Sequence, residues 1–121
     1  MDGGYVPVLT IPIADENGHA INSENDDIVN VLQKELAAEH VVQLIEAPGF
    51  LDDKDDPDSL VPSLTRGELE RREQQVEGRM KRKMLALRRL FESGASRVII
   101  ADGRVESPVT AALSGKGTII Q

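Results

Sequence analysis

The sequence predicts an α/β fold, a three-layer αβα sandwich around a mostly parallel sheet. Segments rich in β-branched residues alternate along the chain with segments whose apolar residues recur at helical spacing. Strands that alternate with helices pair in parallel, because each helix carries the chain back across a face of the sheet. The core must be aliphatic, since aromatic residues are only 2% of a chain that is 40% hydrophobic. A length of 121 residues is typical of one domain.

The first elements are a hairpin and an amphipathic helix. Residues 5–13 are rich in β-branched residues but include two prolines, and this combination predicts a strand near a sheet edge. Asp-Glu-Asn-Gly at 15–18 predicts a turn, and residues 19–21 a short returning strand. Ser23 and Asp26 have the spacing of a capping box, and apolar residues at helical spacing then predict a helix to about residue 38.

The central part of the chain alternates between extended and helical segments. Residues 40–45 are expected to form a strand, and residues 60–64 a short extended piece. Thr65 and Glu68 form a second capping box, which opens a charged helix to about Gln75. A further helix from Arg79 to before Gly94 is predicted to carry one apolar face, made of Met80, Met84, Leu87 and Phe91.

The last part of the chain predicts two strands around a short helix. Residues 97–101 are typical of a buried strand, and residues 117–120 of a final strand. Ser107-Pro108 indicates a helix start, because proline suits the first turn. Predicted strands therefore end at Ile21, Ile45 and Ala101, and ligands of such sheets bind beyond the carboxyl ends of the strands.

Composition narrows the class of protein. A net charge of −7 and the scarcity of aromatic residues disfavour nucleic-acid binding, which needs a basic face and stacking platforms. There is no cysteine, so disulfides and thiol catalysis are excluded. No apolar run reaches membrane-spanning length, and a cytoplasmic protein without membrane contact is expected. The acidic run 52–58 lacks the glycine and terminal glutamate of an EF-hand and is expected to be a solvated loop.

Two helix starts combine residues that suit phosphoryl transfer. Residues 22–27 supply an amide and carboxylates, and residues 78–83 supply a lysine, where backbone N–H groups favour anions. Such a reaction needs a cation for the developing charge and an acidic group to orient that cation. The alternative is plain capping in the first segment and a solvated basic helix face, paired with nearby glutamates, in the second.

Other motifs are weaker. Gly115-Lys116-Gly117-Thr118 resembles a phosphate-binding loop, but the upstream glycine is missing and no Ser or Thr directly follows the lysine. His19 and His40 lack the spacing of metal ligands. No metal site made of protein side chains alone is expected.

Several motifs occur in register along the chain. They are Asn-x-x-x-Asp at 22–26, Pro-Gly-Phe-Leu at 48–51, Asp-Ser-Leu-Val-Pro-Ser-Leu-Thr at 58–65 and Gly-x-Met-x-x-Lys at 78–83. Together they resemble the amino acid kinase family, most closely the C-terminal, nucleotide-binding half of acetylglutamate kinases. The closing segment 97–108 is similar to the branch acting on a LysW-type amino-group carrier protein. The resemblance implies the carbamate kinase-like fold, with residues 1–121 as the ATP-binding C-terminal portion and the N-terminal substrate half absent.

The resemblance also implies roles for individual residues. Lys83 matches the lysine that stabilises the transferring phosphoryl group, Asp26 the aspartate that positions catalytic lysines, and Asn22 the asparagine that contacts the amino-acid substrate. The implied nucleotide-binding residues come from a strand-end loop and from a segment that closes over the adenosine. They are Glu46, Ala47, Gly49, Phe50 and Leu51 in the loop, and Gln75, Val76 and Glu77 in the closing segment.

The chain departs from the family pattern in two ways. Ile45-Glu46 stands where the family often has Ser or Thr followed by Asp, so the nucleotide contacts of this loop are altered. The glycine-rich phosphate loops and the second catalytic lysine of the family have no counterpart in residues 1–121. Each lost donor costs on the order of 3–4 kcal/mol in the transition state, so the chain alone is expected to have little activity.

The resemblance implies an ATP-dependent carboxylate kinase that makes an acyl phosphate in lysine or arginine biosynthesis, with Mg²⁺ carried on the nucleotide. The acceptor is either aminoadipate or glutamate on the carrier protein, or free N-acetylglutamate. The complete enzyme is expected to be a homo-oligomer. A truncated, non-catalytic nucleotide-binding fragment is the competing class, while the ending at 101–108 disfavours aspartate, uridylate and carbamate kinases.

Overall fold

A four-stranded sheet with the strand order β3–β5–β6–β4 forms the centre of the structure, a computed structural model that describes residues 3–121. The strands span His40–Ile45 (β3), Ser63–Leu64 (β4), Arg97–Asp102 (β5) and Thr118–Ile120 (β6). β3 pairs with β5 and β4 with β6 in parallel, while β5 and β6 are antiparallel. The prediction of a mostly parallel sheet is confirmed.

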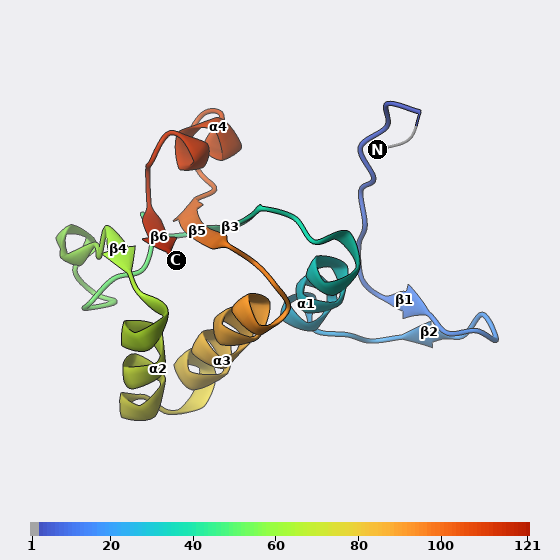
Figure 1. Cartoon of the computed structure of the whole chain (residues 1–121), viewed down its shortest axis with the longest axis horizontal. Helices are drawn as coiled ribbons and strands as arrows, with labels where there is room; N and C mark the ends of the chain where they lie inside the picture. Colours follow the sequence, from blue (N-terminus) through green and yellow to red (C-terminus); the bar gives the residue numbers. More distant parts are fainter. Residues whose placement is uncertain (1–2) are drawn as a thin grey trace.

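Helices cover both faces of this sheet (Figure 1). α3 (Gly78–Glu92) packs against β5 on one face, with α2 (Arg66–Gln75) beside it, and α4 (Pro108–Leu113) packs against β5 and β3 on the other. α1 (Asn25–Leu36) packs against α3. A single 3₁₀ turn, η1 (Pro57–Ser59), lies within the acidic loop. The predicted αβα layering is confirmed.

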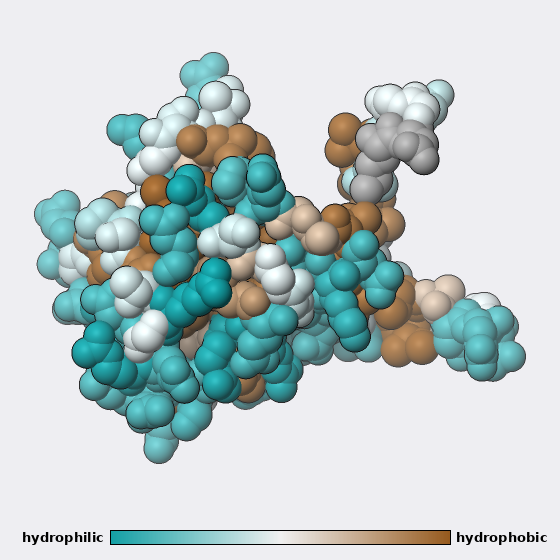
Figure 2. Space-filling model, in the orientation of Figure 1, coloured by the Kyte–Doolittle hydropathy of each residue, from teal (hydrophilic) through white to brown (hydrophobic). Residues whose placement is uncertain are grey.

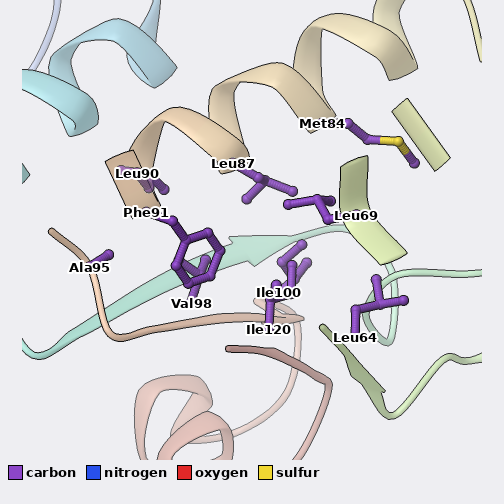
Figure 3. Packing of buried hydrophobic residues seen from close by; sticks show 10 residues of the cluster. All are labelled: Leu64, Leu69, Met84, Leu87, Leu90, Phe91, Ala95, Val98, Ile100 and Ile120. Carbon is purple, nitrogen blue, oxygen red and sulfur yellow. The ribbon is translucent and has the colours of Figure 1, made fainter. Parts of the chain in front are cut away.

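The core has one cluster on each face of the sheet. The larger cluster joins the sheet to α2 and α3, and Figure 3 shows the α3 side chains facing the strands. Its buried members are Leu64, Leu69, Met84, Leu87, Leu90, Phe91, Ala95, Val98, Ile100 and Ile120. The smaller cluster, Ile99, Ala101 and Ala112, lies under α4. Residues 98–101 therefore contribute alternately to the two clusters, as strand geometry requires.

The N-terminal segment differs from the prediction. The expected strand over residues 5–13 is wrong: only β1 (Ile13–Ala14) pairs, with β2 (Ala20–Ile21), around the predicted turn. Among the strands of residues 3–121, none pairs with the segment before β1, and its prolines cannot donate a backbone hydrogen bond. The segment extends away from the sheet as an exposed apolar arm (Figures 1 and 2).

Local helix signals were confirmed in one case and wrong in another. Thr65 caps α2 as predicted, because its hydroxyl accepts a hydrogen bond from Glu68 N (3.2 Å) and Glu68 Oε2 accepts one from Thr65 N (2.7 Å). The Ser23–Asp26 capping box does not form, since α1 starts one residue later with Glu24 at the cap position and no side-chain cap bond. Within residues 3–121, no helix is long and apolar enough to cross a membrane.

Candidate nucleotide site

The carboxyl ends of β3 and β5 lie side by side. Ile45 is the register partner of Asp102, and Gly103 N donates to Ile45 O at 2.9 Å. The chain leaves β3 at this edge and forms the strand-end loop, residues 46–51. Polar groups at the carboxyl edge of a parallel sheet are placed where ligands bind in this class of fold.

The strand-end loop is held against β6 by two buried residues. Thr118 is fully buried, and its hydroxyl accepts a hydrogen bond from Phe50 N (2.8 Å) while it donates one to Val61 O (2.6 Å). Gly49 lies so close that an added Cβ would be 2.7 Å from Leu60 Cδ1 and 2.8 Å from Thr118 Oγ1. The sequence therefore needs glycine at position 49 for close packing.

Four of the predicted nucleotide residues meet Lys83 at a small apolar hollow. This hollow has a volume of about 160 Å³. Its lining includes Ala47, Gly49, Phe50 and Leu51 of the loop, with Ile45, Lys54, Met80, Lys83 and Ile100. Met80 was expected on the buried face of its helix, and that is wrong: it is 40% exposed and contributes to this hollow.

A larger, charged hollow of about 650 Å³ lies between α1 and α3. Asp26 and Lys83, to which the resemblance assigns catalytic roles, both line it, but no ion pair between them is found within residues 3–121. The remaining lining residues are Glu24, Asp27, Arg79, Arg82, Leu85, Ala86 and Arg89. The hollow is thus acidic on the side of α1 and basic on the side of α3.

Lys83 is shared by the two hollows. Lys83 is half-buried on α3. It lines both hollows, and none of the ion pairs found within residues 3–121 includes it. Asp26 is exposed in the first turn of α1, where its backbone carbonyl accepts a hydrogen bond from Asn30 Nδ2 at 3.0 Å. An ammonium group in this position can offset the negative charge of phosphate groups that pass from the apolar hollow to the charged one.

The other candidate residues lie outside these two hollows. Asn22 is exposed between β2 and α1, and Glu46 is exposed at the start of the strand-end loop. Gln75 lines a separate hollow of about 350 Å³ with Asp52, Glu68, Arg71 and Arg72. Val76 packs against the larger core cluster, and Glu77 stands at the N-cap of α3 without a capping bond. These assignments remain predictions.

An arginine–aspartate pair lies at the end of β5. Arg104 contacts Asp102 through Nε–Oδ1 and Nη2–Oδ2, both at 2.8 Å, and these hydrogen bonds lower the pKa of Asp102 to about 2. The same carboxylate raises the pKa of Arg104, with a small contribution from Glu46. Asp102 therefore stays ionised beside the carboxyl edge of the sheet, and its negative charge is balanced by the guanidinium group of Arg104.

The acidic residues do not form a metal cage. Among residues 3–121, no group of three or more His, Asp or Glu side chains is placed to hold a metal ion. Mg²⁺ that is bound through one or two carboxylates and nucleotide phosphates needs no such cage. The carboxylates that line the larger hollow suit this kind of binding.

Sequence reasoning missed two residues that shape the site. Thr118 follows Gly117, and this motif had been weighed only as a phosphate loop; its hydroxyl instead fastens the strand-end loop. Arg72 on α2 is not singled out by the sequence analysis, but its Nη1 is 2.6 Å from Asp52 Oδ1. The available signal for Thr118 was a hydroxyl in a predicted strand directly after a glycine. No local sequence signal pointed to Arg72.

Comparison with known proteins places the chain in a family. A model of the amino acid kinase family matches residues 1–102, and the chain belongs to this family. It is 38% identical over 123 residues to a [LysW]-aminoadipate kinase from Thermus thermophilus, covering 100% of this chain and 46% of that protein. It is 35% identical over 108 residues to an acetylglutamate kinase from a Synechococcus species, covering 87% of this chain and 37% of that protein.

The fold comparison agrees. A carbamate kinase from Giardia lamblia has the same fold, with a TM-score of 0.64 and 21% identity over 88% of this chain and 35% of that one. The chain spans less than half the length of the two curated relatives it matches here. The two curated relatives are kinases by name, one of [LysW]-aminoadipate and one of acetylglutamate.

Proposed function

We propose that residues 1–121 form the ATP-binding portion of a carboxylate kinase that converts a side-chain carboxylate of an amino-acid derivative into an acyl phosphate. The observation that carries the proposal is the position of Lys83, which borders both the hollow of the strand-end loop and the hollow of Asp26. A nucleotide whose adenosine end lies toward the loop would extend its phosphates past this ammonium group.

Residue roles follow from charge and position. In the complete enzyme a substrate carboxylate oxygen attacks the γ-phosphorus, and the bond from that phosphorus to the β–γ bridging oxygen breaks, leaving ADP. Lys83 offsets negative charge on the bridging and γ-oxygens, and Asp26 orients Lys83 from the facing helix. Asn22 contacts the amino-acid substrate. Mg²⁺ carried on the phosphates would supply further charge neutralisation.

The acceptor we propose is aminoadipate or glutamate attached to a LysW-type carrier protein. Support comes from the higher identity to the [LysW]-aminoadipate kinase, 38% against 35% for the acetylglutamate kinase. Free N-acetylglutamate is the second candidate, favoured by the several acetylglutamate kinases among the relatives. Arg79, Arg82 and Arg89 on α3 form a basic surface, which would favour carrier binding if the carrier is acidic.

Isothermal titration of Mg-ATP into the chain tests nucleotide binding, with Lys83→Met as the variant. The matched control is Lys81→Met, because Lys81 is exposed on the same helix and lines none of the hollows described above. We expect binding by the native chain and by the control, and binding weakened by at least about tenfold in Lys83→Met. Failure of the native chain to bind Mg-ATP would refute the proposal.

Phosphoryl transfer needs a second assay. The chain is combined with a polypeptide that supplies the remaining part of the kinase domain, and the acyl phosphate is trapped with hydroxylamine. Product from carrier-bound aminoadipate or glutamate, but not from N-acetylglutamate, would support the carrier branch, and the reverse would support the second candidate. Nucleotide binding without product from either acceptor would favour a non-catalytic nucleotide-binding module.

A further inference from the structure

Arg72 on α2 reaches the strand-end loop by two contacts. Its Nη1 lies 2.6 Å from Asp52 Oδ1, and its guanidinium group lies 5.5 Å from the centre of the Phe50 ring. Both partners come from the segment directly after β3, about 20 residues earlier in the chain. A guanidinium group that pairs with a carboxylate and lies over an aromatic ring restricts both partners.

The loop is fixed from the other side by backbone bonds. Phe50 N donates to Thr118 Oγ1 at 2.8 Å, and Phe50 O accepts from Val61 N at 2.9 Å. The backbone of Phe50 is therefore held by β6 and by the segment before β4. Its ring is the part that Arg72 restrains from α2.

Arg72 also lies three residues before Gln75 on the same helix. Residues at this spacing are neighbours on a helix surface, and both line the hollow of about 350 Å³ that also includes Asp52. α2 ends at Gln75, and residues 75–77 lead directly into α3, which carries Lys83. Arg72 thus bridges the two segments assigned to the adenosine end of the nucleotide.

We propose that Arg72 is a positioning residue of the nucleotide site: by holding Phe50 and Asp52 against α2, it sets the spacing between the strand-end loop and residues 75–77. This inference rests on the proposed function and names a residue outside the set that binds or reacts. Its effect is pre-organisation, because a loop already held in place loses less freedom when the ligand binds.

The experiment compares three substitutions with a matched control. Arg72→Met removes both contacts, Arg72→Lys keeps a charge for Asp52 but loses the planar group over the ring, and Asp52→Asn weakens the ion pair alone. The control is Arg66→Met. Arg66 lies on the same helix with its guanidinium group 4.6 Å from the Phe91 ring, at the end remote from Gln75.

Isothermal titration measures the dissociation constants of Mg-ATP and of Mg-tripolyphosphate, which lacks the adenosine. We expect Arg72→Met to weaken Mg-ATP about 5- to 10-fold, and Arg72→Lys and Asp52→Asn about 2- to 3-fold. Arg66→Met should change it less than about twofold, and tripolyphosphate binding should stay constant in every variant. Amide hydrogen exchange at Asp52 and Val61 should speed up in Arg72→Met, since both amides hydrogen-bond within the restrained segment.

The outcomes separate this inference from the proposed function. Equal Mg-ATP binding by the native chain and Arg72→Met, or equal weakening by Arg66→Met, would overturn the inference and leave the function standing. A native chain that binds no Mg-ATP would overturn the function. The exchange comparison then still decides whether Arg72 restrains the loop, and unchanged exchange would overturn that as well.

Discussion

Replacing Thr118 by Val removes the hydroxyl that fastens the strand-end loop and keeps the shape of the side chain. Thr118 is fully buried, and its hydroxyl makes two hydrogen bonds, from Phe50 N at 2.8 Å and to Val61 O at 2.6 Å. Val leaves both backbone groups without this partner inside a packed segment. We therefore expect lower stability and a loosened nucleotide site together.

The magnitude follows from the two backbone groups. An unsatisfied buried donor or acceptor costs about 1–3 kcal/mol, and both residues are half-buried, so we expect a loss of about 2–4 kcal/mol in the free energy of unfolding. Domains of this size have total stabilities of about 5–15 kcal/mol, so the loss is large. Urea unfolding followed by circular dichroism measures it as a shifted midpoint at constant slope.

A conservative variant separates the hydroxyl from the packing. Thr118→Ser keeps the hydroxyl and loses one methyl group, which costs about 1 kcal/mol. Thr110→Val is the control, because Thr110 is exposed on α4 and surface changes stay within about 0.5 kcal/mol. If Thr118→Val destabilises no more than Thr118→Ser, the two hydrogen bonds do not hold the loop and the reasoning is wrong.

Two further predictions concern ion pairs. Arg104 lowers the pKa of Asp102 from 3.8 to about 2, so the ion pair stabilises the fold fully above about pH 4, and this stabilisation is lost as the pH falls toward 2. Asp102→Asn should therefore make the urea midpoint depend less on pH over this range. An unchanged pH profile in the variant would contradict the prediction. Glu73 is buried and its Oε2 lies 2.9 Å from Arg88 Nε between α2 and α3. Glu73→Ala should cost about 1–3 kcal/mol by calorimetry, because the guanidinium group of Arg88 is only partly exposed to water, and a loss below about 0.5 kcal/mol would count against this pair.

The parts of the fold that sequence could predict were decided by near neighbours. The capping box of Thr65 and Glu68 formed, since both partners lie within one helical turn. The strand predicted over residues 97–101 formed and extends by one residue to Asp102, and its apolar run is buried on both faces of the sheet. The antiparallel pairing of β5 with β6 depends on how α4 turns the chain, which no local pattern encodes.

The sequence could propose residues for the candidate site, but it could not give their arrangement in space. Asp26 and Lys83 were chosen by motif, and only the packing of α1 on α3 brings them to one hollow. Met80 was misplaced because helical spacing alone cannot say where the sheet ends. It lies one turn before Met84, which is 2% exposed, but Met80 itself is 40% exposed at the small apolar hollow. Arg72 was missed because its partners, Asp52 and Phe50, lie about 20 residues earlier in the chain and reach it only in the folded structure.

The helical period of α3 explains why the shared cation stands at position 83. Met80 and Lys83, three residues apart, line the small apolar hollow, while Arg79 and Lys83, four apart, line the charged one. The residue after Lys83 is buried in the core and the residue before it is exposed on the charged side alone. A lysine moved by one position would therefore face either the core or one hollow, whereas a cation at position 83 borders both.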